Sequence, residues 1–144
     1  MADGYTIVTW NGLGFDFPVL ADESGLLDRC IHLAENHIDL HFHTAGFLGF
    51  VSLPNTDEGL GLRWKTEGVY DAPISALWAA GRHWEVIDYC IRHVVATLRL
   101  SVAGREVKRV SWISANGTQS SIDLPRGWLP VSEARSLAHR THRG

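Results

Sequence analysis

The sequence predicts an α/β fold that is rich in helices and closes with a C-terminal β-hairpin, and three observations support this prediction. Residues 5–10 form a nearly uninterrupted apolar run, which is typical of a strand buried on both faces of a sheet. Apolar residues recur at helical spacing over residues 72–100. Asn116 and Gly117 separate two short strand-forming runs, which is a strong signal for a hairpin.

Several helices are expected to follow the strand at residues 5–10. The apolar spacing over residues 16–36 predicts one helix that is broken or bent near Gly25. Three short elements are expected next: a strand at 38–40, a helix or turn at 41–50 and a helix at 53–62. Because Asn55 is followed three residues later by Glu58, we expect a capping box to start the last of these helices.

The strongest helical pattern lies between residues 72 and 100, where Gly81 separates two predicted helices, the second over 83–101. Their apolar residues share one stripe: Ile74, Leu77, Trp78, Trp84, Ile87, Ile91, Val94, Val95 and Leu98. Beyond them we expect hairpin strands around Val107, Val110 and Trp112 and at 118–124, a turn-rich connector at 125–130, a short helix at 131–138 and a frayed basic end.

Length and composition indicate a single globular domain over residues 1–144. With a net charge of −3, the chain lacks the bulk charge of a nucleic-acid-binding protein, so any such contact must be local or metal-mediated. Cys30 and Cys90 lack a CxxC spacing and are expected to be buried free thiols in a reducing compartment. Since no apolar run reaches about 18 residues, we expect no membrane contact and a cytoplasmic protein.

The stretch VTWNGLGFDFPVL, residues 8–20, places Asp16 between Phe15 and Phe17. A carboxylate among apolar side chains is costly to desolvate unless a cation or a hydrogen-bond donor receives it, which favours a chemical role. The alternative is that Asp16 only caps the following helix, with Pro18 in its first turn. The sequence leaves both interpretations open.

Two stretches resemble motifs of the DEDD-superfamily 3′–5′ exonucleases, in particular the proofreading domains of family B DNA polymerases and their stand-alone bacterial relatives. TWNGLGFDFPVL resembles the second motif, an Asn-x-x-x-Phe-Asp core after the fourth strand of an RNase H-like sheet, and Asn11, Phe15 and Asp16 match it. DYCIRHVVATLRL resembles the third motif, Tyr-x-x-x-Asp-Val on the last helix, and Tyr89 and Val94 match it.

This resemblance covers roughly residues 5–102 and implies an RNase H-like core, with residues 103–144 forming the hairpin and the short C-terminal helix. It also implies metal-dependent phosphodiester hydrolysis, in which four acidic residues hold two Mg²⁺ ions that activate a water and stabilise the leaving oxygen. By the same resemblance, Asp16 is a metal ligand, Asn11 braces its loop, Phe15 contacts a terminal base and Tyr89 orients the water.

The sequence departs from the family pattern at two places. His93 stands where the third motif has aspartate, and its neutral imidazole suits Mn²⁺ or Zn²⁺ better than Mg²⁺. The Asp-x-Glu of the first motif is absent, because only four residues precede Tyr5. We therefore expect an N-terminally truncated RNase H-like fold, with Asp16 and His93 as candidate ligands of Mg²⁺ or Mn²⁺, or no metal in the isolated chain.

These departures leave two classes of function open. The first is a metal-dependent 3′–5′ exonuclease whose missing carboxylates come from a partner chain, from a preceding gene product or from other residues of this chain. The second is a non-catalytic RNase H-like module that binds nucleic acid or protein. Where nucleic acid is the ligand, the candidate is a single-stranded end.

The predicted strand at residues 5–10 has a further consequence, since a strand without its neighbours exposes an edge that invites pairing. The hairpin at 107–124 can cover this edge, or a partner chain or a second copy can, which makes the chain a candidate homo-oligomer. The six tryptophans suit such an interface, or else they are ordinary core and surface residues.

Two further groups of residues are weaker candidates. His37, His41 and His43 with Asp39 form a local cluster that could bind Zn²⁺, and Asp39 could instead be a second acidic group near Asp16. Acidic residues elsewhere are expected at a helix start or on a solvated helix face: Asp57, Glu58 and Asp88.

Overall fold

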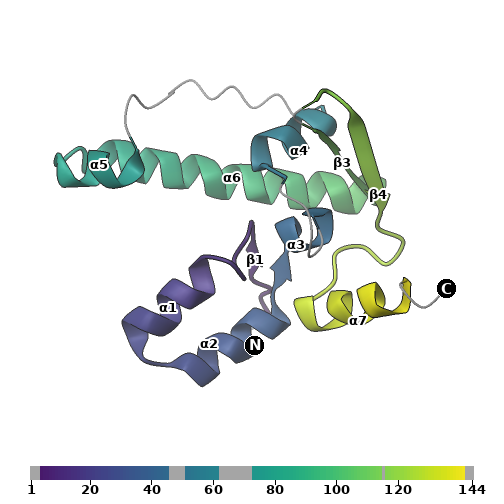
Figure 1. Cartoon of the computed structure of the whole chain (residues 1–144), viewed down its shortest axis with the longest axis horizontal. Helices are drawn as coiled ribbons and strands as arrows, with labels where there is room; N and C mark the ends of the chain where they lie inside the picture. The colour runs from purple at the N-terminus through teal and green to yellow at the C-terminus, as the bar shows by residue number, and fades with distance from the viewer. Residues whose placement is uncertain (1–3, 46–50, 62–72, 115, 142–144) are drawn as a thin grey trace.

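A computed structural model describes residues 4–45, 51–61, 73–114 and 116–141, and the structural statements below concern these residues. They form a mixed α/β fold rich in helices (Figure 1). The elements in chain order are β1 (Val8–Thr9), α1 (Asp16–Ser24), α2 (Leu27–Asn36), β2 (Ile38–Asp39), α3 (Leu40–Ala45), α4 (Leu53–Gly59), α5 (Ile74–Ala79), α6 (His83–Val107), β3 (Arg109–Ile113), β4 (Gln119–Asp123) and α7 (Val131–Thr141).

The first helical region is divided at Gly25, as predicted. Gly25 ends α1 in the left-handed conformation with φ 67°, and its N–H donates to the Ala21 carbonyl at 3.0 Å. The Ser24 hydroxyl accepts from the N–H of Leu26 at 3.2 Å, just before α2 begins. The two helices pack against each other, so the break turns the chain back on itself.

Strands β1 and β2 are parallel, with Val8 opposite Ile38 and Thr9 opposite Asp39. Both predicted strands therefore exist, but the expectation of a long buried strand over residues 5–10 is wrong. Tyr5 is 79% exposed, so the start of this run is not buried. The pairing between β1 and β2 is short because β2 ends at Asp39, where α3 begins at Leu40. A parallel pair this short depends on the helices packed around it.

Helix α4 begins at Leu53, as predicted, and ends at Gly59, three residues before the predicted end. The Ser52 hydroxyl caps it by accepting from the Asn55 N–H at 3.3 Å, and Pro54 occupies the first turn. The predicted capping box at Asn55 and Glu58 is wrong, because the stronger cap lies three residues upstream. Of the predicted helix or turn at 41–50, residues 41–45 belong to α3, and residues 46–50 lie outside the described part of the chain.

Helices α5 and α6 meet at Gly81, which has φ 75°, and this break was predicted. Helix α6 extends six residues past the predicted end at 101, so Val107 is helical and not part of a strand. Lys108 ends the helix in the left-handed conformation with φ 51°. At Gly104 an added Cβ would lie 2.5 Å from the Trp128 ring, so glycine permits the connector after β4 to pack closely on α6.

The C-terminal hairpin is confirmed. Strands β3 and β4 pair antiparallel from Arg109 opposite Asp123 to Ile113 opposite Gln119, and Gly117 has φ 79° in the turn. Helix α4 packs directly on β3, where Gly59 lies against the Ser111 backbone with no room for a side chain. The hairpin therefore closes the end of the core formed by α4 and α6.

The predicted helix at 131–138 is α7, which continues to Thr141. It is attached to the N-terminal half of the chain by a hydrogen bond of 3.0 Å from the Val131 N–H to the His37 carbonyl. An ion pair of 3.0 Å between Arg135 and Glu35 joins α7 to α2. Figure 1 shows α7 beside α2, although the two helices are far apart in the sequence.

The main core lies between α3, α4, α6 and the hairpin. Its buried apolar members are Leu40, Leu53, Ala96, Leu100, Val110 and Leu124. Of the two cysteines, both free, Cys30 is buried as expected, but Cys90 is exposed. The prediction for Cys90 is wrong because it lies on a part of α6 that the core does not cover.

Asp57 was expected at a solvated helix start, but it is 2% exposed and its Oδ1 atom has no hydrogen-bond partner. Burial raises the pKa of Asp57 to about 6, although Arg99 lowers it in part. The folded state therefore binds a proton more tightly than the unfolded chain does. Between about pH 4 and about pH 6, this group makes the protein less stable as the pH rises.

We predict that Asp57→Asn removes this pH dependence and raises the unfolding free energy by about 2 kcal/mol at neutral pH, because the amide cannot ionise. Urea unfolding at about pH 4.5 and about pH 7.5 measures the effect. The control is Glu58→Gln at a neighbouring exposed position. It should change the unfolding free energy by the same amount at both pH values. An unchanged pH slope in Asp57→Asn would contradict the prediction.

Candidate functional site

A pocket of about 410 Å³ lies between β1 and α6, where the two resemblance motifs meet. It is bordered by the strand region, by the first residue of α1 and by one face of α6. Its lining residues are Thr6, Val8, Thr9, Trp10, Asp16, His93, Val94, Thr97 and Leu98. The structure therefore brings Asp16 and His93, the two predicted metal ligands, to the same pocket.

The three residues around Asp16 have different environments. Phe17 is 6% exposed and packs its ring against His37 at a centroid distance of 4.6 Å. Phe15 is 64% exposed and occupies the capping position of α1, so the alternative in which Asp16 is the helix cap is wrong. Asp16 lies in the first turn, where the helix dipole favours a negative charge, and it borders the pocket.

The loop before Asp16 is a tight turn that depends on its glycines. The Asn11 carbonyl accepts from the N–H groups of Gly14 and Phe15, both at 3.1 Å, and Asn11 itself has φ 65°. Gly12 lies against the Thr9 side chain with no space for a Cβ, and at Gly14 a Cβ would lie 2.6 Å from the Asn11 side chain. The backbone of Asn11 thus organises the turn that leads to Asp16.

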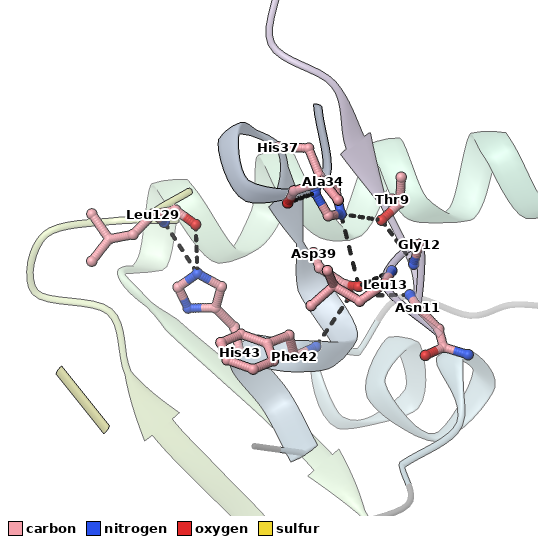
Figure 2. A network of polar contacts seen from close by, with 10 residues as sticks. All are labelled: Thr9, Asn11, Gly12, Leu13, Ala34, His37, Asp39, Phe42, His43 and Leu129. Atoms are coloured by element: carbon pink, nitrogen blue, oxygen red, sulfur yellow. Dashed lines mark hydrogen bonds and ion pairs between the residues drawn. The ribbon is translucent and has the colours of Figure 1, made fainter. Parts of the chain in front are cut away.

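Asp39 holds this loop through hydrogen bonds to its backbone (Figure 2). Its Oδ1 atom accepts from the N–H of Asn11 at 3.0 Å and of Phe42 at 3.1 Å, and its Oδ2 atom accepts from the N–H of Leu13 at 3.0 Å. The residue is 1% exposed. Because both oxygens are used by the backbone, Asp39 positions the Asp16 loop and is not available as the second acidic group that the sequence suggested.

The electrostatics of Asp39 follow from the same contacts. Burial by itself raises the pKa of this carboxyl, but His37 and the three backbone N–H groups lower it by more, so the pKa lies below its ordinary value. The Nε2 atom of His37 lies 3.8 Å from Oδ2 and 3.0 Å from the Thr9 hydroxyl. The Nδ1 atom of His37 lies 2.6 Å from the Ala34 carbonyl, to which it donates.

The histidines proposed as a zinc cluster have separate surroundings. His41 stacks edge-on against Trp10, with the ring centroids 5.3 Å apart. The Nε2 atom of His43 lies 3.1 Å from the N atom and 2.9 Å from the O atom of Leu129, and burial lowers the pKa of this histidine. Within the described ranges, no three histidine, cysteine or acidic side chains are arranged to hold a metal ion.

On the other side of the pocket, α6 presents His93. Tyr89, one turn earlier, stacks on the His93 ring with centroids 4.5 Å apart and an interplanar angle of 40°. Burial lowers the pKa of His93, so its imidazole is neutral at pH 7 and has a nitrogen lone pair for a ligand. Tyr89 thus lies next to the candidate ligand His93. Asp88, at the start of this motif, forms a surface ion pair with Arg92 at 2.6 Å, as expected for a solvated helix face.

Comparison of the chain with protein-family models, curated proteins and solved structures finds no match. None of the helices in the described ranges has both the length and the apolar character needed to cross a membrane.

The donor set in the pocket does not fit a pair of Mg²⁺ ions. Mg²⁺ requires oxygen ligands in near-octahedral geometry, and two ions require several carboxylates. Among the described residues that line the pocket, Asp16 is the one acidic residue, and His93 supplies a nitrogen ligand. One carboxylate and one neutral imidazole suit a single softer ion such as Mn²⁺ or Zn²⁺, so no hydrolytic step follows from these residues alone.

We predict that Asp39→Asn lowers the unfolding free energy by about 2–3 kcal/mol at pH 7, because the amide places a donor where the backbone N–H groups need an acceptor. The pKa of Asp39 is lowered in the folded state, so its stabilisation is complete above about pH 4 and is lost as the pH falls through the folded pKa. The difference from the wild type should therefore shrink in acid.

Chemical denaturation at neutral and acidic pH tests this expectation, with the exposed Asp22→Asn on α1 as the matched control. Equal stability of Asp39→Asn and the wild type at pH 7 would show that the carboxylate is not required to hold the loop.

Proposed function

We propose that this chain is a nucleic-acid-binding module of the RNase H-like, 3′–5′ exonuclease type that is catalytically incomplete by itself. The observation that carries the proposal is that Asp16 and His93 line the same pocket. Asp16 lies in the stretch that resembles the second exonuclease motif, and His93 lies in the stretch that resembles the third. These residues are 77 positions apart in the sequence, and their motifs were identified separately.

The order of elements gives further support. The resemblance implies that the second motif follows a central strand and that the third motif lies on a late helix. In this chain, the turn at Asn11 follows β1, β1 has a parallel neighbour reached through α1 and α2, and α6 packs against β1. This order of elements next to the pocket is one observation that supports the proposal.

The pocket has features suited to the end of a single strand. The ring of Phe15 is 64% exposed beside Asp16 and offers a surface on which a terminal base can stack. The charge of Asp16 repels a phosphate group, whereas a divalent cation held between them makes the contact favourable. The neutral imidazole of His93 is a suitable second ligand for that cation. We therefore propose metal-dependent binding of a strand end.

Binding without hydrolysis is the activity that we propose for the isolated chain, because the described pocket lining offers one carboxylate and one imidazole, whereas two-metal hydrolysis requires several carboxylates. The exposed apolar residues of α6, such as Trp84 and Ile91, favour a second candidate function, a non-catalytic module that uses this scaffold to bind protein. The two candidates differ in whether the Asp16 pocket binds single-stranded nucleic acid.

We predict that short labelled single-stranded DNA or RNA binds the chain in the presence of Mn²⁺, and that Phe15→Ala weakens binding by about 5- to 100-fold through the loss of base stacking. Fluorescence anisotropy measures the affinity. Leu26→Ala, which removes another exposed apolar side chain between α1 and α2, is the matched control. A circular single strand without ends should bind more weakly than a linear strand.

Equal binding by wild type and Phe15→Ala, or no binding by the wild type, would contradict the proposal. A degradation assay on the same linear strands with Mg²⁺ should show no cleavage, and metal-dependent shortening from the 3′ end would show that the chain is not catalytically incomplete.

We predict that His93→Asp raises the affinity for Mg²⁺, because it places a second oxygen ligand on the α6 side of the pocket. Without metal, repulsion from Asp16 should destabilise the variant by about 1 kcal/mol. Thermal melts with and without Mg²⁺ measure both effects, and His32→Asp on the exposed face of α2 controls for the added charge. If Mg²⁺ stabilises His93→Asp no more than the wild type, position 93 is not a metal-ligand position.

A further inference from the structure

The exposed face of α6 carries a row of large apolar side chains, here called the α6 stripe. Its members and their exposed fractions are Trp84 82%, Ile87 40%, Ile91 56%, Val94 68%, Val95 37% and Leu98 61%. The sequence pattern identified these residues as one stripe, but the core of the described structure is formed by other α6 residues, Ala96 and Leu100 among them. Figure 1 shows that α6 is the longest element and that its N-terminal half extends beyond β1 and α3.

We infer that the α6 stripe is the interface with a second copy of this chain, and that the two α6 helices pack antiparallel about a two-fold axis at Ile91. An interface of this symmetry must be complementary to itself. Trp84 and Leu98 lie seven residues before and after Ile91, and Ile87 and Val95 lie four residues before and after it. An antiparallel helix centred on Ile91 therefore places Trp84 beside the Leu98 of the other copy and Ile87 beside its Val95. The two Ile91 residues meet at the axis, and Val94 lies opposite Asp88.

The spacing also favours a helix as the partner element. Residues Trp84, Ile87, Ile91, Val94 and Leu98 follow each other at intervals of three, four, three and four, which is the pattern of a coiled-coil seam. A seam of this kind is narrow and accepts the side chains of one facing helix. The α6 helix of a second copy has this shape and the same pattern.

The charges next to the α6 stripe do not oppose this association. Glu85 pairs with Arg82, and Asp88 pairs with Arg92, within the same helical region. Each pair cancels its own charge, so two copies can approach without strong repulsion. The six exposed side chains present on the order of several hundred Å² of apolar surface, comparable to the ~800 Å² that each partner buries in a standard interface.

The interface also touches the candidate site, because Val94 and Leu98 belong to the α6 stripe and to the pocket lining. A second copy on the stripe would therefore form part of the pocket wall. The earlier expectation of a homo-oligomer placed its contact at residues 5–10, and we now place it on α6. Assembly can be measured without nucleic acid, so its outcome is separate from that of the proposed function.

The first experiment is sedimentation equilibrium of the full chain from low micromolar to several hundred micromolar concentration. We expect a reversible dimer. Ile91→Glu places two like charges together at the axis and should weaken dimerisation by about a hundredfold or more. Leu27→Glu, at a similarly exposed apolar position on α2, should leave the dimer unchanged. Circular dichroism of both variants shows whether the fold is retained.

The second experiment uses Cys90, which is exposed and directly precedes Ile91, whereas Cys30 is buried. In the proposed dimer, the two Cys90 residues lie only about 3 Å apart along the helix axes. A short bis-maleimide should therefore join two wild-type chains, and Cys90→Ser and Ile91→Glu should both prevent the cross-link.

A chain that stays monomeric at all concentrations, or a dimer that survives Ile91→Glu, would overturn the proposal. A dimer that Ile91→Glu disrupts but that does not cross-link through Cys90 would overturn the antiparallel arrangement about Ile91.

Discussion

The arrangement of the N-terminal half depends on one buried carboxylate. Asp39 ends β2, immediately precedes α3 and accepts hydrogen bonds from the loop that follows β1. Without Asp39, the N–H groups of Asn11 and Leu13 would lose their acceptor in a partly buried region, which costs up to about one hydrogen bond for each group. Because this loop leads directly into α1, the position of Asp16 at the pocket follows from Asp39.

Helix α6 is the second element on which the structure depends, because its faces contact the core, the pocket and the solvent. Ala96 and Leu100 pack into the core, His93 and Thr97 border the pocket, and Ile87 and Ile91 remain exposed. A helix that is apolar over so much of its surface normally has neighbours on more than one side. The proposed binding site and the proposed dimer interface are therefore adjacent parts of the same element, and Val94 and Leu98 contribute to both.

Much of the local structure was predictable because it depends on residues that are neighbours in the sequence. The helix break at Gly25, the break at Gly81 and the hairpin turn at Gly117 all use a positive φ that glycine adopts without strain. The association of Asp16 with His93 was also anticipated, but only through the resemblance to a family with both motifs at one site. Periodicity and spacing alone do not indicate that residues 16 and 93 meet at one pocket.

The sequence by itself determined most of the helices, the hairpin and the glycines that end helices, because propensities, turn chemistry and helical periodicity act over a few residues. It did not determine the short length of β1 or the end of α6 at Val107. Only the tertiary structure decided how those elements are used. Asp39 is an anchor because the chain returns to it from 26 and 28 residues away, Asp57 is buried because α4 packs on the hairpin and α6, and Cys90 is exposed because no described element covers that side of α6. Burial and hydrogen-bond partners depend on such distant contacts, which a pattern of neighbouring residues does not specify.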